Sequence, residues 1–110
     1  MATVYNNIDK VAGDPSAVTV KIELLWDKTD SPVAKDTDTF TMYQGPFQTD
    51  VDEEGHWETS LVPNDVIEPT DNVYRITEGD WLYYIFVPSG ATPTYWTGGI
   101  QVTKPSWVVS

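Results

Sequence analysis

The chain has 110 residues, and its 17 acidic side chains against six lysines and arginines give a formal net charge of -11. A surface this acidic repels phosphate groups, which argues against nucleic acids and anionic membranes as partners. The chain has no cysteine, so disulfides and zinc-thiolate sites are excluded, and no apolar run approaches the ~20 residues of a membrane span.

The first 17 residues show no regular apolar spacing. Met1–Lys10 lacks the apolar core of a signal peptide, so we expect the product to be soluble in the compartment where it is made. The turn sequence Gly13-Asp14-Pro15-Ser16 follows. We therefore expect an N-terminal arm or a marginal edge strand over residues 1–17 and a single domain over residues 18–110.

The first clear strand pattern begins at residue 18. Apolar side chains recur there at every second position, which is the period of a half-buried strand. They are Val18, Val20, Ile22, Leu24 and Trp26. A charged loop over residues 27–38 comes next, and the segments 39–43 and 47–51 have the composition of further strands.

The segment Thr49–Pro69 predicts an acidic turn, a strand and a looped return. Gly55 ends the acidic run and suits a backbone with positive φ. Beyond it a two-residue alternation predicts a strand, whose inward positions are Trp57, Thr59 and Leu61. Pro63-Asn64-Asp65 has the chemistry of a turn and ends that strand.

The remainder of the chain contains four more expected strands, at residues 73–77, 81–87, 94–97 and 100–103. Trp81–Val87 is apolar on both faces, which predicts either a central strand or a strand half covered by another chain. No segment has a convincing helical pattern. The predicted fold class is therefore all-β, an antiparallel β-sandwich of the immunoglobulin-like or transthyretin-like kind with roughly seven to nine short strands.

Charge is distributed unevenly along the chain. Residues 50–80 hold ten acidic side chains, whereas residues 81–110 hold none and have Lys104 as their single base. Interface cores are depleted in charge and enriched in tryptophan and tyrosine. The C-terminal third is thus a predicted docking surface, with the inner strands of the sandwich as the alternative. The predicted interface residues are Trp81, Tyr83, Tyr95, Trp96 and Trp107.

Four of these aromatic residues also fit a carbohydrate-binding module. Flat aromatic rings stack on the apolar faces of sugars, while nearby Asp, Asn and Gln side chains bind the hydroxyl groups. The candidates are Trp81, Tyr83, Tyr95 and Trp96. Core packing or subunit contact is the competing interpretation, because amphipathic aromatic side chains are favoured there too.

The acidic turn resembles the start of a calcium-binding loop. Asp50, Asp52 and Glu54 alternate, and a glycine stands at the sixth position. The twelfth position, however, is Leu61 in place of a bidentate acid, and no helices are expected on either side. A solvated turn is the favoured interpretation, and weak calcium binding stays open.

The sequence offers no recognisable catalytic constellation. His56 is the only histidine, and we expect it to be an exposed turn residue. No nucleophile elbow, phosphate-binding loop or histidine-rich metal pattern occurs. Seventeen carboxylates allow some pair to lie at glycosidase spacing, but nothing marks one pair. We therefore expect neither enzymatic activity nor a cofactor.

Residues 49–88 resemble a known kind of domain. The matching residues are Thr49-Asp50, Gly55 and Trp57, Leu61-Val62-Pro63-Asn64-Asp65, Pro69, Tyr74-Arg75-Ile76 and Ile85-Phe86-Val87-Pro88. Their order resembles the small β-sandwich domains of tailed-phage virion proteins, namely the minor tail proteins and related appendages of phages that infect actinobacteria. More loosely, it is similar to transthyretin-like and carboxypeptidase-regulatory domains.

The resemblance implies a structural role and no active site. We expect a non-enzymatic virion protein, made in the host cytoplasm and attached to the capsid as a decoration protein or to the tail as a minor tail protein. Its expected partners are the major capsid or tail protein and further copies of itself, in a dimer or trimer, because exposed sheet edges favour self-association. The alternative is a carbohydrate-binding module that recognises a host surface or a polysaccharide.

Overall fold

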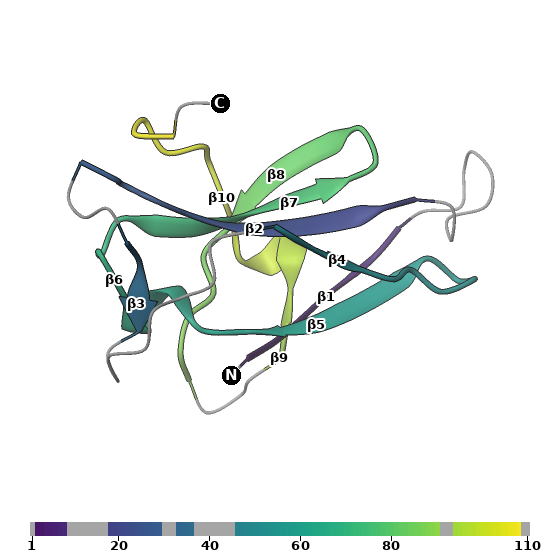
Figure 1. Cartoon of the computed structure of the whole chain (residues 1–110). Helices are drawn as coiled ribbons and strands as arrows, with labels where there is room; N and C mark the ends of the chain where they lie inside the picture. The colour runs from purple at the N-terminus through teal and green to yellow at the C-terminus, as the bar shows by residue number, and fades with distance from the viewer. Residues whose placement is uncertain (1, 9–17, 30–32, 37–45, 91–93, 109–110) are drawn as a thin grey trace.

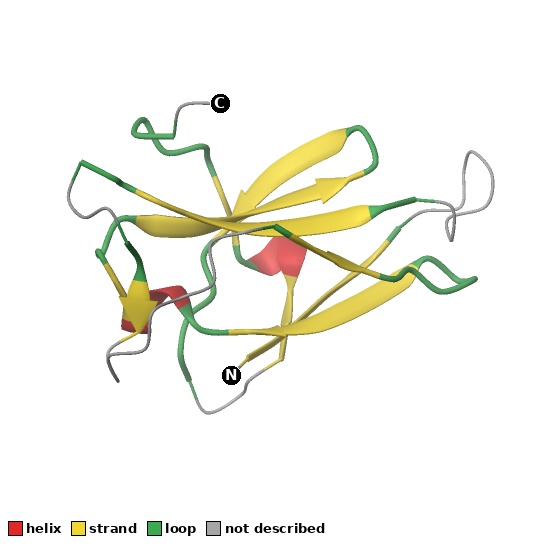
Figure 2. Ribbon diagram, in the orientation of Figure 1, coloured by secondary structure: helices red, strands yellow, loops and turns green. Residues whose placement is uncertain are grey.

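The computed structural model describes residues 2–8, 18–29, 33–36, 46–90 and 94–108, and these form two packed β-sheets (Figure 1). The larger sheet has five strands in the order β10-β8-β7-β2-β4, and the smaller has three in the order β5-β1-β9. Strands and short connections make up almost all of this structure, and the helical segments are single turns (Figure 2). The predicted all-β sandwich is therefore confirmed.

The strands of the five-stranded sheet are β2 (Val20–Trp26), β4 (Phe47–Thr49), β7 (Asn72–Glu78), β8 (Trp81–Ile85) and β10 (Gln101–Val102). The three-stranded sheet contains β1 (Ala2–Asn7), β5 (His56–Leu61) and β9 (Thr94–Trp96). A third, two-stranded sheet pairs β3 (Lys35–Asp36) with β6 (Ile67–Glu68). The helical turns are η2 (Asn64–Val66) and η3 (Thr97–Gly99). Among the described residues, no helix is long and apolar enough to cross a membrane.

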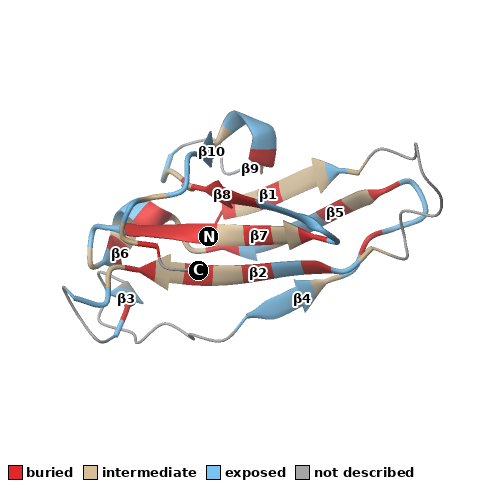
Figure 3. Ribbon diagram, turned by 90° about the horizontal axis from the view of Figure 1, so that it is seen from above, coloured by how far each residue is buried: buried red, intermediate tan, exposed pale blue. Residues whose placement is uncertain are grey.

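The main core lies between the two sheets and follows the predicted alternation. The inward side chains of β2 are all buried, namely Val20, Ile22, Leu24 and Trp26. Trp57 of the opposite sheet is the largest fully buried side chain of the core. Burial of each such side chain stabilises the fold by about 1.5–3 kcal/mol, so these alternating positions fix which face of each sheet points inward. Figure 3 shows the buried centre of β7 and β2 and the exposed edge strand β4.

The N-terminal segment differs from the prediction. Residues 2–7 are neither an arm nor an edge strand, because β1 is the central strand of the smaller sheet. It pairs with β5 in antiparallel and with β9 in parallel orientation. Ala2 and Val4 face the core, but Asn6 occupies the third inward position, which hides the apolar alternation in the sequence. Residues 9–17, the rest of that predicted segment, lie outside the described residues, as does the expected strand at 39–43.

The turn before β5 is built as the sequence predicts. Gly55 has φ +86°, and its carbonyl oxygen accepts a hydrogen bond from the backbone N–H of Ile8 at 2.6 Å. A Cβ at Gly55 would lie 2.2 Å from the carbonyl oxygen of Ile8, so both the dihedral angle and the close approach require glycine. The chain then alternates through β5, with Trp57 and Leu61 buried.

The looped return after β5 is held by two buried asparagines. Asn64 donates from Nδ2 to Oδ1 of Asn72 at 2.6 Å and accepts the backbone N–H of Val87 at 2.6 Å. Asn72 in turn donates to backbone carbonyl oxygens of the loop, including that of Pro69 at 2.8 Å. These bonds satisfy loop backbone groups that water does not reach, so the return adopts one conformation.

A second, smaller core covers the outer face of the five-stranded sheet. Val73, Tyr84 and Val108 are buried there, and Leu25, Phe86 and Trp107 pack against them. The segment that leads to the C-terminus crosses over this face (Figure 1). The strand beginning at Trp81 is predicted to be either central or half covered by another chain. In the structure, β8 lies inside the five-stranded sheet, and residues of the same chain cover both faces of its second half. Its first two residues remain exposed.

Candidate functional site

A cavity of about 640 Å³ lies at the end of the sandwich where the β7–β8 hairpin turns. Its volume is within the range of small-molecule sites. The polar side chains that line it are Asn6, Asn7, Glu78, Thr97 and Gln101. The apolar and aromatic ones are Ile8, Val18, Trp81 and Trp96, and the backbone of Gly98 completes the wall.

The buried carboxylate of this cavity belongs to Glu78, at the end of β7. Glu78 pairs with Trp81 across the β7–β8 hairpin, and directly opposite residues of an antiparallel pair share a face of the sheet. The carboxylate accepts hydrogen bonds from Nε1 of Trp57 at 2.6 Å and from Nδ2 of Asn6 at 2.9 and 3.1 Å. Glu78 is only 7% exposed, so these donors offset the loss of water around the charge.

The indole of Trp96 is exposed yet held in place. Its exposed fraction is 54%, and its Nε1 donates a hydrogen bond to Oδ1 of Asn6 at 3.2 Å. The ring also lies against Gly98, where an added Cβ would come within 2.5 Å of the indole atom Cζ2. An aromatic surface open to solvent is thus fixed by one hydrogen bond and one glycine.

The second exposed tryptophan is held by an aromatic contact. Trp81 is 55% exposed, and its ring lies 4.5 Å from that of Tyr83, centroid to centroid, at an interplanar angle of 35°. Tyr83 is buried, and its hydroxyl donates to Oγ1 of Thr97 at 3.2 Å. Burial raises the pKa of Tyr83 well above its usual value, so the hydroxyl keeps its proton and remains a donor in alkaline solution as well.

The cavity therefore combines two fixed aromatic surfaces with hydrogen-bonding groups and one negative charge. Among the described residues that line it, none is lysine, arginine or histidine. Such a set suits a ligand that has an apolar face and several hydroxyl or other donor groups. No side chain of the set is arranged as a nucleophile with an adjacent base, since the hydroxyl of Thr97 accepts its hydrogen bond from Tyr83.

The structure divides the five predicted interface residues among three places. Trp81, Tyr83 and Trp96 meet around the cavity. Tyr95 packs against the main core, and Trp107 lies on the outer face of the five-stranded sheet. The exposed part of the prediction, Trp81 and Trp96, is thus concentrated at one end of the molecule.

Sequence reasoning missed Asn6 and Glu78, although the pattern contained a signal for both. Each polar residue occupies an inward position of a two-residue alternation, Asn6 after Ala2 and Val4 and Glu78 after Tyr74 and Ile76. A polar side chain at such a position must be paired inside the protein. The expected strands did not include β1, and the one at residues 73–77 ended before Glu78, so neither residue was assigned an inward position.

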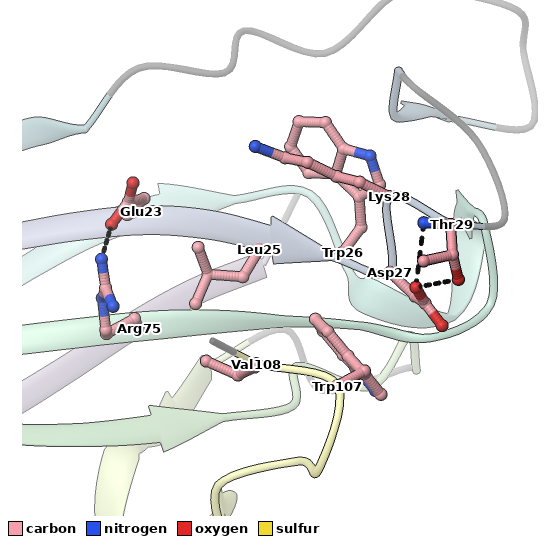
Figure 4. Close-up of a pocket in the computed structure, with 9 residues that line it drawn as sticks. All are labelled: Glu23, Leu25, Trp26, Asp27, Lys28, Thr29, Arg75, Trp107 and Val108. Carbon is pink, nitrogen blue, oxygen red and sulfur yellow. Dashed lines mark hydrogen bonds and ion pairs between the residues drawn. The ribbon is translucent and has the colours of Figure 1, made fainter. Parts of the chain in front are cut away.

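A second cavity, of about 430 Å³, lies on the outer face of the five-stranded sheet (Figure 4). Leu25, Trp107 and Val108 form its apolar part. Its charged groups already have partners within the chain. Arg75 is paired with Glu23, and Asp27 accepts two hydrogen bonds from Thr29. The ammonium group of Lys28 lies over the ring of Trp26. Unlike the first cavity, it has, among the described residues that line it, no large aromatic side chain that is more than half exposed.

The acidic turn carries no metal centre in the described part of the chain, where no group of three histidine, aspartate or glutamate side chains is placed to hold an ion. Asp52 instead caps the turn, since its Oδ1 accepts the backbone N–H groups of Glu54 and His56 at 2.9 Å each. Of the three alternating acids that resemble the start of a calcium loop, Asp50, Asp52 and Glu54, Asp52 thus caps the turn.

The expectation for His56 is wrong. The residue begins strand β5 and is half-buried, and both ring nitrogens have partners, one on the neighbouring strand β1 and one on β5 itself. Nδ1 lies 2.9 Å from Oδ1 of Asn7, and Nε2 lies 3.0 Å from Oε1 of Glu58. The ring also stacks on Tyr5. The histidine therefore ties β1 to β5 on the outer face of the smaller sheet.

Comparisons with known proteins find no family model that matches this chain and no matching relative among curated proteins.

Proposed function

We propose that the chain is a non-enzymatic carbohydrate-binding module that holds a sugar against Trp81 and Trp96, beside the carboxylate of Glu78. One observation supports this assignment above the others. Two tryptophans are more than half exposed in one cavity, yet each is held by contacts within the protein. Large apolar side chains left in water in this way usually mark a binding surface.

The physical chemistry of sugars matches this arrangement. One face of a pyranose ring presents C–H groups that stack on an aromatic ring, while its edge carries hydroxyl groups. The indoles of Trp81 and Trp96 supply the aromatic surfaces, and the side-chain amide of Gln101 supplies hydrogen-bonding groups nearby. Because the tryptophans are fixed before the ligand arrives, binding loses little side-chain entropy.

The test is a glycan array followed by calorimetry on the glycan that binds best. Trp81→Ala and Trp96→Ala should each weaken binding at least tenfold, which corresponds to about 1.4 kcal/mol or more for loss of a buried aromatic contact. Trp107→Phe is the control, since Trp107 lines the other cavity, on the outer face of the five-stranded sheet. An array without any bound glycan, or full affinity in both alanine variants, would contradict the proposal.

A second proposal, attachment to a phage capsid or tail, draws on a different surface. Leu82 and Val102 are 43% and 36% exposed, and both share the outer face of their sheet with Tyr84. They lie in the acid-free C-terminal third, and residues 49–88 carry the resemblance to virion domains. A module attached by this surface would leave the tryptophan cavity open to a host glycan, so the two proposals are compatible.

Incorporation into particles tests the attachment. Leu82→Glu should reduce it, because a carboxylate in an apolar interface loses its water without gaining a partner. Phe47→Glu serves as the matched control, since Phe47 is 38% exposed on β4, at the opposite edge of the same sheet. Equal incorporation of both variants would refute the assignment of this surface. The expected dimer or trimer is checked by sedimentation of the wild-type chain.

A further inference from the structure

We infer that the tryptophan-lined cavity selects uncharged or amino-bearing sugars and excludes sugars that carry carboxylate, sulfate or phosphate groups. This inference rests on the proposed carbohydrate binding and specifies the ligand class. It follows from the charge of the cavity and from the direction of the hydrogen bonds around Glu78.

The carboxylate of Glu78 is the one charged group among the described residues that line the cavity. Its hydrogen bonds from Trp57 and Asn6 are all donated to it, so it acts as an acceptor, as an ionised carboxylate does. A sugar hydroxyl or ammonium group that reaches it has a proton to donate. A ligand carboxylate, sulfate or phosphate brings only further acceptors.

The negative charge acts at short range and with little screening. Glu78 is 7% exposed, and charges that are partly buried are screened by salt far less than surface charges. The amide of Asn6 cannot turn to meet an anionic ligand, because it is already bonded to both Glu78 and Trp96. The amide therefore has no free donor that would compensate a second negative charge.

The rest of the molecule acts in the same direction. The net charge of -11 gives the surface a negative potential, which lowers the local concentration of anionic ligands. The nearest charged residue along the hairpin is Asp80, one position before Trp81, and it adds to this repulsion. Both the cavity and its surroundings thus disfavour acidic glycans.

Matched pairs of glycans test the inference. The array contains neutral glycans together with their sialylated, sulfated and uronic-acid counterparts, and the pairs that bind are measured by calorimetry at 50 mM and 500 mM salt. We expect the acidic member to bind at least tenfold more weakly at low salt, and high salt to remove only the part of this difference that comes from the surface charge, because the charge of Glu78 is little screened. Glu78→Gln should reduce the preference within each pair, and because each ratio is measured on one variant, a change in overall stability does not affect it.

The outcomes separate the two proposals. Binding of acidic glycans as tight as that of neutral ones, lost on Trp96→Ala, overturns the charge selectivity but leaves carbohydrate binding standing. Should Glu78→Gln fail to fold, the wild-type pairs and their salt dependence still decide the question. Absence of any bound glycan overturns carbohydrate binding and this inference together.

Discussion

Substitution of Gly98 by alanine tests the cavity without removing any of its functional groups. An added Cβ would lie 2.5 Å from Cζ2 of Trp96 and 2.6 Å from Cη2 of the same ring. Gly98 does not have positive φ, so alanine fits its backbone conformation. The strain therefore falls on the indole, which is exposed and free to move outward.

The size of that movement follows from the distances. Carbon atoms in contact lie about 3.5–4.0 Å apart, so the indole must retreat by roughly 1 Å or more. The hydrogen bond from Nε1 of Trp96 to Asn6 already measures 3.2 Å, and the same retreat takes it beyond hydrogen-bonding distance. Loss of this exposed bond should lower the free energy of unfolding by about 1 kcal/mol at most. Binding should suffer more, at least tenfold, because a preformed aromatic surface is lost.

The matched control is Gly99→Ala, one residue further along. A Cβ there would lie 3.9 Å from Cε3 of Trp96, which is an ordinary contact, so the indole stays where it is. Calorimetry with the best glycan from the array gives the affinities, and thermal denaturation gives the stabilities. Wild-type affinity in Gly98→Ala, or equal losses in both variants, would refute the argument that the orientation of the indole matters.

Three further predictions concern the fold, and four substitutions test them. Gly55→Ala should lower the free energy of unfolding in chemical denaturation by several kcal/mol, because the clash of the new Cβ with a carbonyl oxygen 2.2 Å away adds to the strain of about 1–3 kcal/mol at positive φ. Gly79→Ala is the control. Gly79 has φ +61° and its nearest neighbour would lie 3.5 Å from the new Cβ, so this variant should show the strain cost alone. Asn64→Ala should cost about 2–4 kcal/mol, since buried partners lose their bonds, and a loss below 1 kcal/mol would argue against the network. Burial raises the pKa of Tyr74 and Tyr83 in the folded chain above the ordinary value near 10. The stability that these neutral hydroxyls contribute is therefore complete below about pH 10 and is lost as the pH rises further. Tyr74→Phe should make this alkaline loss of stability less steep in denaturation curves measured between pH 8 and 12.

Much of the fold could be predicted because alternation is a direct consequence of one buried face. The strand from Val20 to Trp26 has apolar residues at every second position, and the strand from Trp57 to Leu61 alternates in the same way with Thr59 at its middle inward position; the sequence predicts both. The central strand β1 was missed for a physical reason. Its third inward side chain is Asn6, which is paired by side chains from distant parts of the chain, and a single sequence does not reveal such partners.

The site could be predicted only in part. Aromatic side chains in a segment without acidic residues pointed to Trp81 and Trp96, and both line the cavity. The same reasoning placed Tyr95 and Trp107 with them, because composition does not tell which face of a strand a ring occupies. The hydrogen bonds that join Glu78 to Asn6 link residues 72 positions apart in the chain. Only the packing of one sheet on the other brings these groups together.

The polar residues of the cavity serve the fold and the site through the same bonds. Asn6 accepts from Trp96 through Oδ1 and donates to Glu78 through Nδ2, so one amide orients the aromatic surface and satisfies the buried carboxylate. Removing it would leave a buried charge short of donors, which lowers stability as well as affinity. A loss of binding in an Asn6 variant would therefore say little about recognition. Gly98 escapes this coupling, because its substitution moves the indole and leaves the carboxylate paired, and that is why the glycine pair separates recognition from folding.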